Sequence, residues 1–163
     1  MNNCQLFVLP RLIDGEGTHG DVYQISMTRV AKFLAWYRGM PGTLDQNLNR
    51  LAHDFKVASE LYSHGIAVPY SEALREIKHP RDGVVCTAFI MKIIPGINGF
   101  HLLRLDPALF KKAESSANAE ITRAEELGYV RGDLNIGNFI WCHSQRKSYL
   151  VDFVTWGKIA SYN

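Results

Sequence analysis

The feature that most constrains this chain is a glycine-rich segment, residues 15–20, between two sequences typical of β-strands. A glycine-rich turn lets backbone N–H groups approach phosphate oxygens, because no Cβ atom intervenes. Val22 follows in the second strand and is placed to cover a planar base. Gly15, Gly17, Gly20 and Val22 are therefore candidate nucleotide-binding residues, and a glycine-rich hairpin turn is the alternative interpretation.

A lysine follows the glycine-rich segment in an apolar strand, Val30-Ala31-Lys32. A lysine that points into a cleft requires an anion, because an unpaired buried charge is costly. Lys32 is therefore a candidate phosphate-binding residue. The alternative is a lysine on an edge strand, exposed to water.

Three polar residues near the C-terminus complete the pattern. Asp133 and Asn138 lie five residues apart in one loop, and Asp152 follows an apolar strand. Carboxylate and amide oxygens are ligands for a hard cation such as Mg²⁺, and no spacing in the chain suits zinc. We expect Asp133 to orient a hydroxyl group, and Asn138 and Asp152 to bind magnesium. Aspartates that only cap loops are the alternative.

The hydrophobic pattern predicts an α+β fold with two unequal lobes. The first lobe, residues 1–94, is predicted to hold five strands and one helix, and the second, residues 95–163, is predicted to be a reduced helical lobe. Thr43 is a candidate N-cap and Gly65 a candidate terminator of the first helix, and Asp106-Pro107 begins the second. The predicted strands cover residues 6–13, 21–26, 29–35, 71–78, 84–94, 139–142 and 149–153, and the predicted helices cover residues 44–64 and 107–127.

Together these motifs resemble the protein-kinase-like superfamily over nearly the whole chain. Two further phrases carry the resemblance: residues 90–96, IMKIIPG, resemble the hinge, and residues 126–134, ELGYVRGDL, resemble the catalytic loop of atypical kinases. The resemblance implies that Met91, Lys92 and Ile93 read adenine through backbone groups. It also implies ATP and Mg²⁺ as cofactors, and Asp133 and Lys32 as catalytic residues of a phosphotransferase.

In the kinase-like fold an acidic residue of the first helix pairs with the lysine, and two residues compete for this role. The acid of the family lies three turns before the glycine that ends the helix, with apolar residues three, four and seven positions later. Asp54 fits that pattern, whereas Glu60, the helix's only glutamate, is followed by more polar residues. We favour Asp54 and keep Glu60 as the alternative.

The chain departs from the family at three places: Arg131 replaces the loop histidine, Val154 replaces the glycine after Asp152-Phe153, and only eleven residues follow Asp152. These features resemble minimal effector kinases that bacteria inject into eukaryotic cells, among them enterobacterial effectors that engage ubiquitin-conjugating enzymes and the HopBF family. The HopBF resemblance implies a protein serine/threonine kinase whose substrate is a host heat-shock chaperone. It also implies type III secretion into the host cytoplasm, with the bacterial cytoplasm as the alternative.

Three other functions remain open. They are a non-catalytic nucleotide-binding module that engages a host partner such as a ubiquitin-conjugating enzyme, a small atypical kinase or ATPase that assists tRNA modification, and a small-molecule phosphotransferase. A net charge of +2 favours neither nucleic acid nor a membrane surface as partner. The N-terminus does not have the pattern of a cleavable signal peptide, and the three cysteines suit a reducing compartment. We expect a monomer.

Overall fold

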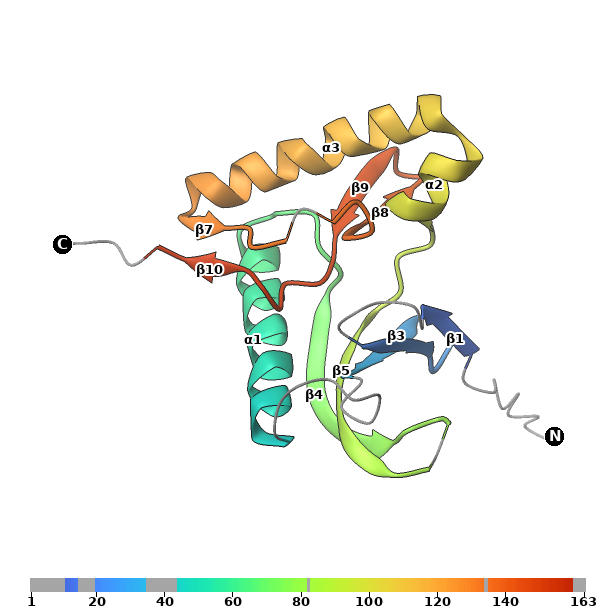
Figure 1. Cartoon of the computed structure of the whole chain (residues 1–163), viewed down its shortest axis with the longest axis vertical. Helices are drawn as coiled ribbons and strands as arrows, with labels where there is room; N and C mark the ends of the chain where they lie inside the picture. Colours follow the sequence, from blue (N-terminus) through green and yellow to red (C-terminus); the bar gives the residue numbers. More distant parts are fainter. Residues whose placement is uncertain (1–10, 15–19, 35–43, 82, 134, 160–163) are drawn as a thin grey trace, which may run out of the picture. The chain divides into compact units, whose positions relative to one another are not determined.

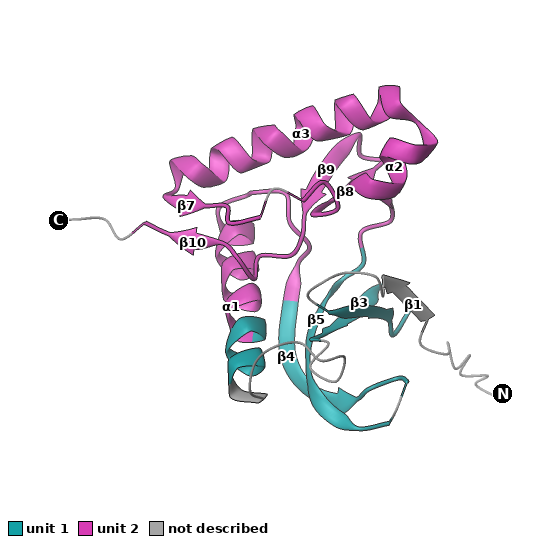
Figure 2. Cartoon of the chain, in the orientation of Figure 1, with its two compact units in different colours: residues 1–51, 72–93 teal, residues 52–71, 94–163 magenta. Residues whose placement is uncertain are grey.

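The structure is a computed structural model that describes residues 11–14, 20–34, 44–81, 83–133 and 135–159. The chain divides into two compact units, shown in Figure 2. Unit 1 contains residues 1–51 and 72–93, and unit 2 contains residues 52–71 and 94–163. The predicted lobes, 1–94 and 95–163, stay a prediction. Gly15, Gly17 and the predicted N-cap Thr43 lie outside the described residues.

Unit 1 holds a five-stranded sheet in the order β1-β2-β3-β5-β4 (Figure 1). Neighbouring strands from β1 to β5 pair antiparallel, and the five strands that the sequence predicted for the N-terminal lobe are confirmed. The strands are β1 (Arg11–Asp14), β2 (Asp21–Gln24), β3 (Arg29–Phe33), β4 (Ser71–Lys78) and β5 (Val85–Lys92).

One face of this sheet forms a small apolar core. Tyr23, Ala31, Phe33, Ala88 and Ile90 are buried together there. Side chains alternate between the two faces of a strand, so the residues next to these in the chain point to the opposite face. The opposite face is therefore the one that carries the side chain of the lysine in β3.

Helix α1 (Leu44–Ser63) is amphipathic, and Asp54 lies within its buried stripe between Leu51 and Leu61. The helix ends where Gly65 adopts a φ of +75°. The Gly65 N–H donates to the Tyr62 carbonyl at 3.0 Å and the Ile66 N–H donates to the Leu61 carbonyl at 3.1 Å. This is the Schellman termination for which glycine is favoured, and it confirms the predicted end of the helix.

Unit 2 contains helices α2 and α3, residues 52–63 of α1 and two small sheets (Figure 1). Helix α3 packs against α2, β7 and β9. The sheets have the strand orders β6-β8-β9 and β10-β7. The elements are β6 (Ile97–Asn98), α2 (Gly99–Leu105), α3 (Pro107–Glu126), β7 (Tyr129–Val130), β8 (Phe139–Cys142), β9 (Lys147–Leu150) and β10 (Gly157–Lys158). No helix in the described part of the chain has the length and apolar character of a membrane span.

The start of α3 is as the sequence predicts. The Asp106 side chain accepts hydrogen bonds from the N–H groups of Ala108 and Leu109, and Pro107 occupies the first turn, where its missing N–H costs nothing.

Several details differ from the sequence prediction. Helix α2 and the two-residue strands β6, β7 and β10 were not predicted, because they are too short to show a helical or a strand period. The predicted strand 149–153 is instead β9, which covers Lys147–Leu150. It ends early because Asp152 has a φ of +64°, a left-handed conformation that is incompatible with a strand.

Candidate functional site

Lys32 lies on β3 with its side chain only 6% exposed. It is opposite Val22 on β2 and Phe89 on β5, so these three side chains share the sheet face away from the apolar core. The unit 1 sheet therefore presents the predicted residues Lys32 and Val22 side by side. Val30 and Met91, which are paired two residues further along, lie on the same face.

The predicted hinge residues lie at the end of β5, where this strand pairs with the start of β3. Met91 pairs with Val30 and Lys92 pairs with Arg29. The Ile93 N–H donates to the Thr28 carbonyl at 3.0 Å. Since that N–H is engaged within unit 1, a contact from Ile93 to a base would have to use its carbonyl oxygen.

Gly20 is the one residue of the glycine-rich segment that the structure describes. Its φ is +153°, and a Cβ atom built on it would lie 2.2 Å from the Phe33 carbonyl oxygen. Both the backbone conformation and the close approach of β3 require glycine here.

The loop between β7 and β8 is organised by its own polar side chains. The Asn135 N–H donates to Asp133 Oδ1 at 3.0 Å, and Asn138 Nδ2 donates to Asp133 Oδ2 at 3.3 Å. The Gly137 N–H in turn donates to Asn135 Oδ1 at 2.8 Å. These bonds fix the Asp133 carboxylate beside the Asn138 amide.

Asp152 joins this pair through the backbone. The Val151 N–H donates to the Asn138 carbonyl at 3.0 Å, which extends the pairing of β8 with β9 by one step. The structure thus joins Asp133 to Asn138 and places Asp152 one residue after the point where the chain pairs with Asn138, all within unit 2. A non-glycine residue in the left-handed region costs roughly 1–3 kcal/mol and persists only where its surroundings impose it, which is common at functional sites.

Gly132 explains why this loop has a glycine before its aspartate. A Cβ atom at Gly132 would lie 2.2 Å from the Thr155 carbonyl oxygen. The segment after Asp152 therefore crosses directly against the loop, and only glycine leaves room for it. Thr155 is a neighbour of the site that the sequence pattern did not indicate.

The two acidic residues that compete to pair with Lys32 have different surroundings in unit 2. Asp54 is 1% exposed, and its Oδ1 accepts the Phe153 N–H at 3.0 Å. Glu60 accepts a short hydrogen bond from the Tyr129 hydroxyl and lies 3.6 Å from the Lys158 ammonium. That hydrogen bond is the main cause that lowers the pKa of Glu60, while burial and the Glu60 carboxylate raise the pKa of Tyr129.

A hollow of about 70 Å³ lies between α3 and the β7–β8 loop. Arg131 lines it together with Asn135 and Asn138 from the loop and Glu114 from α3. The hollow therefore exposes part of the β7–β8 loop on the side that faces α3.

No group of three or more His, Cys, Asp or Glu side chains that could hold a metal occurs among the described residues. A magnesium ion that is bound together with phosphates needs fewer protein ligands, because one or two carboxylates and several waters suffice. The Asn138 and Asp152 oxygens fit that kind of site. The roles of both residues as metal ligands stay predictions.

Sequence reasoning did not name Phe89, which lies opposite Lys32 on the same sheet face. It is placed there only by the pairing of β3 with β5, which no local pattern reveals.

Comparison with known proteins bears on the fold. No protein-family model and no curated protein matches the sequence. Several solved structures match in three dimensions. A co-crystal structure of WbdD with the kinase inhibitor LY294002 has a TM-score of 0.64 and 17% identity, over 93% of this chain and 34% of that one. Monomeric WbdD has a TM-score of 0.58 and 19% identity, over 86% of this chain and 33% of that one.

A further structure, described as that of the bifunctional kinase-methyltransferase WbdD, has a TM-score of 0.58 and 17% identity, over 89% of this chain and 31% of that one. The chain thus spans about a third of the length of the solved structures it matches. The likeness shows that the chain has a kinase-like α+β fold, as the motifs predicted. At this identity it shows the fold alone.

Proposed function

We propose that this chain is a kinase that uses Mg²⁺ and ATP to phosphorylate a serine or threonine hydroxyl of a protein substrate. The observation that carries the proposal is the hydrogen bond from Asn138 to Asp133, together with the backbone bond that pairs Val151, the residue before Asp152, with Asn138. These residues match the kinase catalytic and metal-binding motifs in the sequence, and the chain has a kinase-like fold. The left-handed backbone of Asp152 supports a functional rather than a merely structural role.

In this proposal Asp133 orients the attacking hydroxyl and accepts its proton. The hydrogen bonds from the Asn135 N–H and the Asn138 amide restrict rotation of its carboxylate, so the carboxylate is aligned before the substrate arrives. Such positioning and proton transfer contribute roughly 10²–10⁴-fold to a rate. Most of the remaining catalysis would come from charge neutralisation around the transferred group.

The residues proposed to hold the cofactors are divided between the two units. In unit 2, Asn138 and Asp152 offer oxygen ligands to magnesium. In unit 1, Lys32 offers a cation to the phosphates, and Val22 and Met91 offer apolar surface to a base. Gly15, Gly17 and Gly20 would contribute backbone N–H groups. Bound magnesium–ATP supplies the phosphoryl group and the cation that neutralises its charge.

We extend the proposal to a eukaryotic host protein as substrate, with a heat-shock chaperone as the first candidate. Delivery into the host cytoplasm by type III secretion belongs to the same proposal, and residence in the bacterial cytoplasm is the alternative. The support for this extension is the resemblance of the sequence Arg131-Gly132-Asp133-Leu134 to the loop of minimal effector kinases.

The test is transfer of label from γ-labelled ATP, with magnesium, to the protein itself or to proteins of a eukaryotic lysate. We expect labelled serine or threonine with the wild type and none with Asp152→Ala. Asp133→Asn should reduce the rate by about 10²–10⁴-fold. Glu125→Gln, which changes an exposed carboxylate on α3, is the matched control and should leave the rate unchanged. Mass spectrometry of the labelled band would identify the substrate.

Two departures from the kinase motifs, Arg131 and Val154, favour a second candidate: a module that binds nucleotide without transferring phosphate, and that engages a host partner such as a ubiquitin-conjugating enzyme. Thermal stabilisation by ATP without any label transfer would favour this candidate over the kinase. A small atypical kinase or ATPase that assists tRNA modification would instead hydrolyse ATP without labelling a lysate protein.

A further inference from the structure

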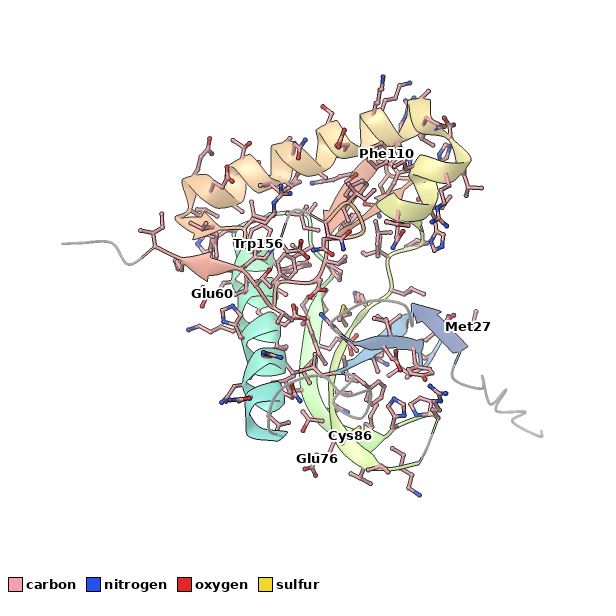
Figure 3. All side chains as sticks on the ribbon, viewed as in Figure 1. Met27, Glu60, Glu76, Cys86, Phe110 and Trp156 are labelled. Carbon is pink, nitrogen blue, oxygen red and sulfur yellow. The ribbon has the colours of Figure 1, made fainter. Side chains whose placement is uncertain are left out.

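The segment that follows Asp152 is bound to helix α1 at three successive points, all within unit 2. The Phe153 N–H donates to Asp54 Oδ1 at 3.0 Å. His53 Nε2 lies 2.6 Å from the Trp156 carbonyl oxygen, to which it donates when Nε2 carries the proton. The Lys158 ammonium lies 3.6 Å from Glu60. Glu60 and Trp156 are seen on the side of α1 where β10 lies (Figure 3).

The third contact, between Lys158 and Glu60, is supported by further contacts with Tyr129 on β7. Lys158 on β10 is paired with Tyr129 on β7, and its ammonium lies 4.9 Å from the centre of the Tyr129 ring. The Tyr129 hydroxyl, on a side chain that is 2% exposed, donates a short hydrogen bond to Glu60. A single carboxylate on α1 therefore holds both strands of the small sheet. The lowered pKa of Glu60 and the raised pKa of Tyr129 fit a proton that stays on the tyrosine.

These contacts bear directly on Asp152. The chain is tied to the β7–β8 loop one residue before Asp152, by the Val151–Asn138 bond, and the peptide group after Asp152 is tied to α1 by the Phe153–Asp54 bond. Between the two ties Asp152 adopts a φ of +64°. A left-handed non-glycine residue persists where its surroundings impose that conformation, and these two ties are such a restraint.

We propose that His53 and Glu60 are positioning residues, which hold the segment 153–158 on α1 and thereby keep Asp152 in the conformation that binds magnesium. We call His53, Asp54 and Glu60 the α1 anchor. The role in catalysis depends on the proposed kinase function, whereas the anchoring of the segment is testable without it.

The proposal also assigns different roles to Glu60 and Asp54. Glu60 acts through Tyr129 and Lys158, so its loss should change the requirement for magnesium and leave the affinity for ATP alone. Asp54 is both in the α1 anchor and the favoured partner of Lys32, so its substitution would not separate the two roles. The informative variants are therefore at Glu60, Tyr129 and His53.

The first measurement is hydrogen exchange of the amides of residues 153–158, followed by mass spectrometry. Tyr129→Phe removes the hydrogen bond to Glu60, and Glu60→Gln removes the charge that strengthens this bond and pairs with Lys158. Each should speed exchange there by about 10- to 100-fold, the effect of losing an interaction with a charged group. The double variant should have less than the sum of the two single effects, since both changes weaken the same bond. Tyr129→Phe keeps the buried ring, so it should disturb the packing of unit 2 less than the other variants.

His53 offers a conservative rescue. His53→Leu removes the donor to the Trp156 carbonyl, whereas His53→Gln keeps an N–H donor on a side chain of similar reach. We expect faster exchange of residues 153–158 with leucine and near wild-type exchange with glutamine. Glu125→Gln is the control for the carboxylate changes, because that side chain is exposed on α3.

The second measurement is the magnesium concentration that gives half-maximal label transfer, taken together with the KM for ATP. In Glu60→Gln and His53→Leu the magnesium requirement should rise by about 10-fold or more, with the KM for ATP unchanged. Unchanged exchange in both variants would refute the anchoring itself. Faster exchange of residues 153–158 with an unchanged magnesium requirement would show that His53 and Glu60 stabilise the fold but do not position Asp152. That result would overturn the proposal. If the wild type transferred no label, the kinase function would fail and the positioning role with it, while exchange would still decide whether α1 anchors the segment.

Discussion

Replacing Gly132 by alanine is the sharpest single test of the site geometry. The residue is exposed, so exposure alone predicts that a methyl group is tolerated. The structure predicts the opposite, because the added Cβ would lie 2.2 Å from the Thr155 carbonyl oxygen and 3.0 Å from the Thr155 carbonyl carbon. Ordinary van der Waals contact begins at 3.4 Å, so the loop and the segment after Asp152 must separate by about 1.2 Å.

The cost follows from that displacement. Forced overpacking of a methyl group costs about 1–3 kcal/mol, since neighbouring backbone must move. For a chain of this length each kcal/mol lowers the melting temperature by roughly 2–4 °C, so a decrease of about 2–12 °C is expected. The effect on turnover should be larger, because Asp133 is the next residue and a misplacement of about 1 Å can cost about 10²-fold in rate.

Gly157→Ala is the matched control. Gly157 is also exposed and also lies in unit 2, yet no atom lies within 4 Å of the Cβ position there. Its alanine variant should be neutral or slightly stabilising, because alanine reduces the freedom of the unfolded chain. The assay is thermal unfolding of both variants, followed by label transfer from γ-labelled ATP. Equal melting temperatures for the two variants would show that the close approach of Thr155 to Gly132 is wrong.

The other predictions concern single side chains. Asp133→Asn should keep the melting temperature within a few degrees of wild type and reduce kcat by about 10²–10⁴-fold; an unchanged kcat would rule out the proposed base. Glu120→Ala should lower the free energy of unfolding by about 2 kcal/mol in urea titrations, because the buried carboxylate accepts the Ala67 N–H at 2.9 Å and pairs with two partly exposed cations. The folded pKa of Glu60 lies below its ordinary value of 4.5, so its interactions stabilise the fold above pH 4.5 and are lost as the pH falls through the lowered value. Acid titration of stability should therefore be shallower below pH 4.5 in Glu60→Gln, and an identical profile would contradict the Tyr129–Glu60 bond.

Much of the architecture follows from local pattern. The strand and helix ranges of unit 1 follow from alternation and from the three-to-four spacing of α1, and that spacing also placed Asp54 on the buried face. The start of α3 at Asp106-Pro107 and the end of α1 at Gly65 follow from the conformational preferences of single residues. These features were predictable because each depends on residues within one or two turns of chain.

The surroundings of Asp152 were not predictable in this way. Its left-handed conformation shortened the predicted last strand, and β7 and β10 are two residues each, too short for any period to show. Seven-residue α2 escaped prediction for the same reason.

The order of the motifs determined by itself which residues belong to the candidate site and which kind of fold could hold them. The tertiary structure alone decided which groups restrain them. The hydrogen bonds of Glu60 to Tyr129, Asp54 to Phe153 and His53 to Trp156 join residues 69, 99 and 103 positions apart. The physical reason is that hydrophobic period and turn chemistry act over a few residues, whereas a hydrogen bond between distant segments exists only once packing has brought its donor and acceptor within about 3 Å.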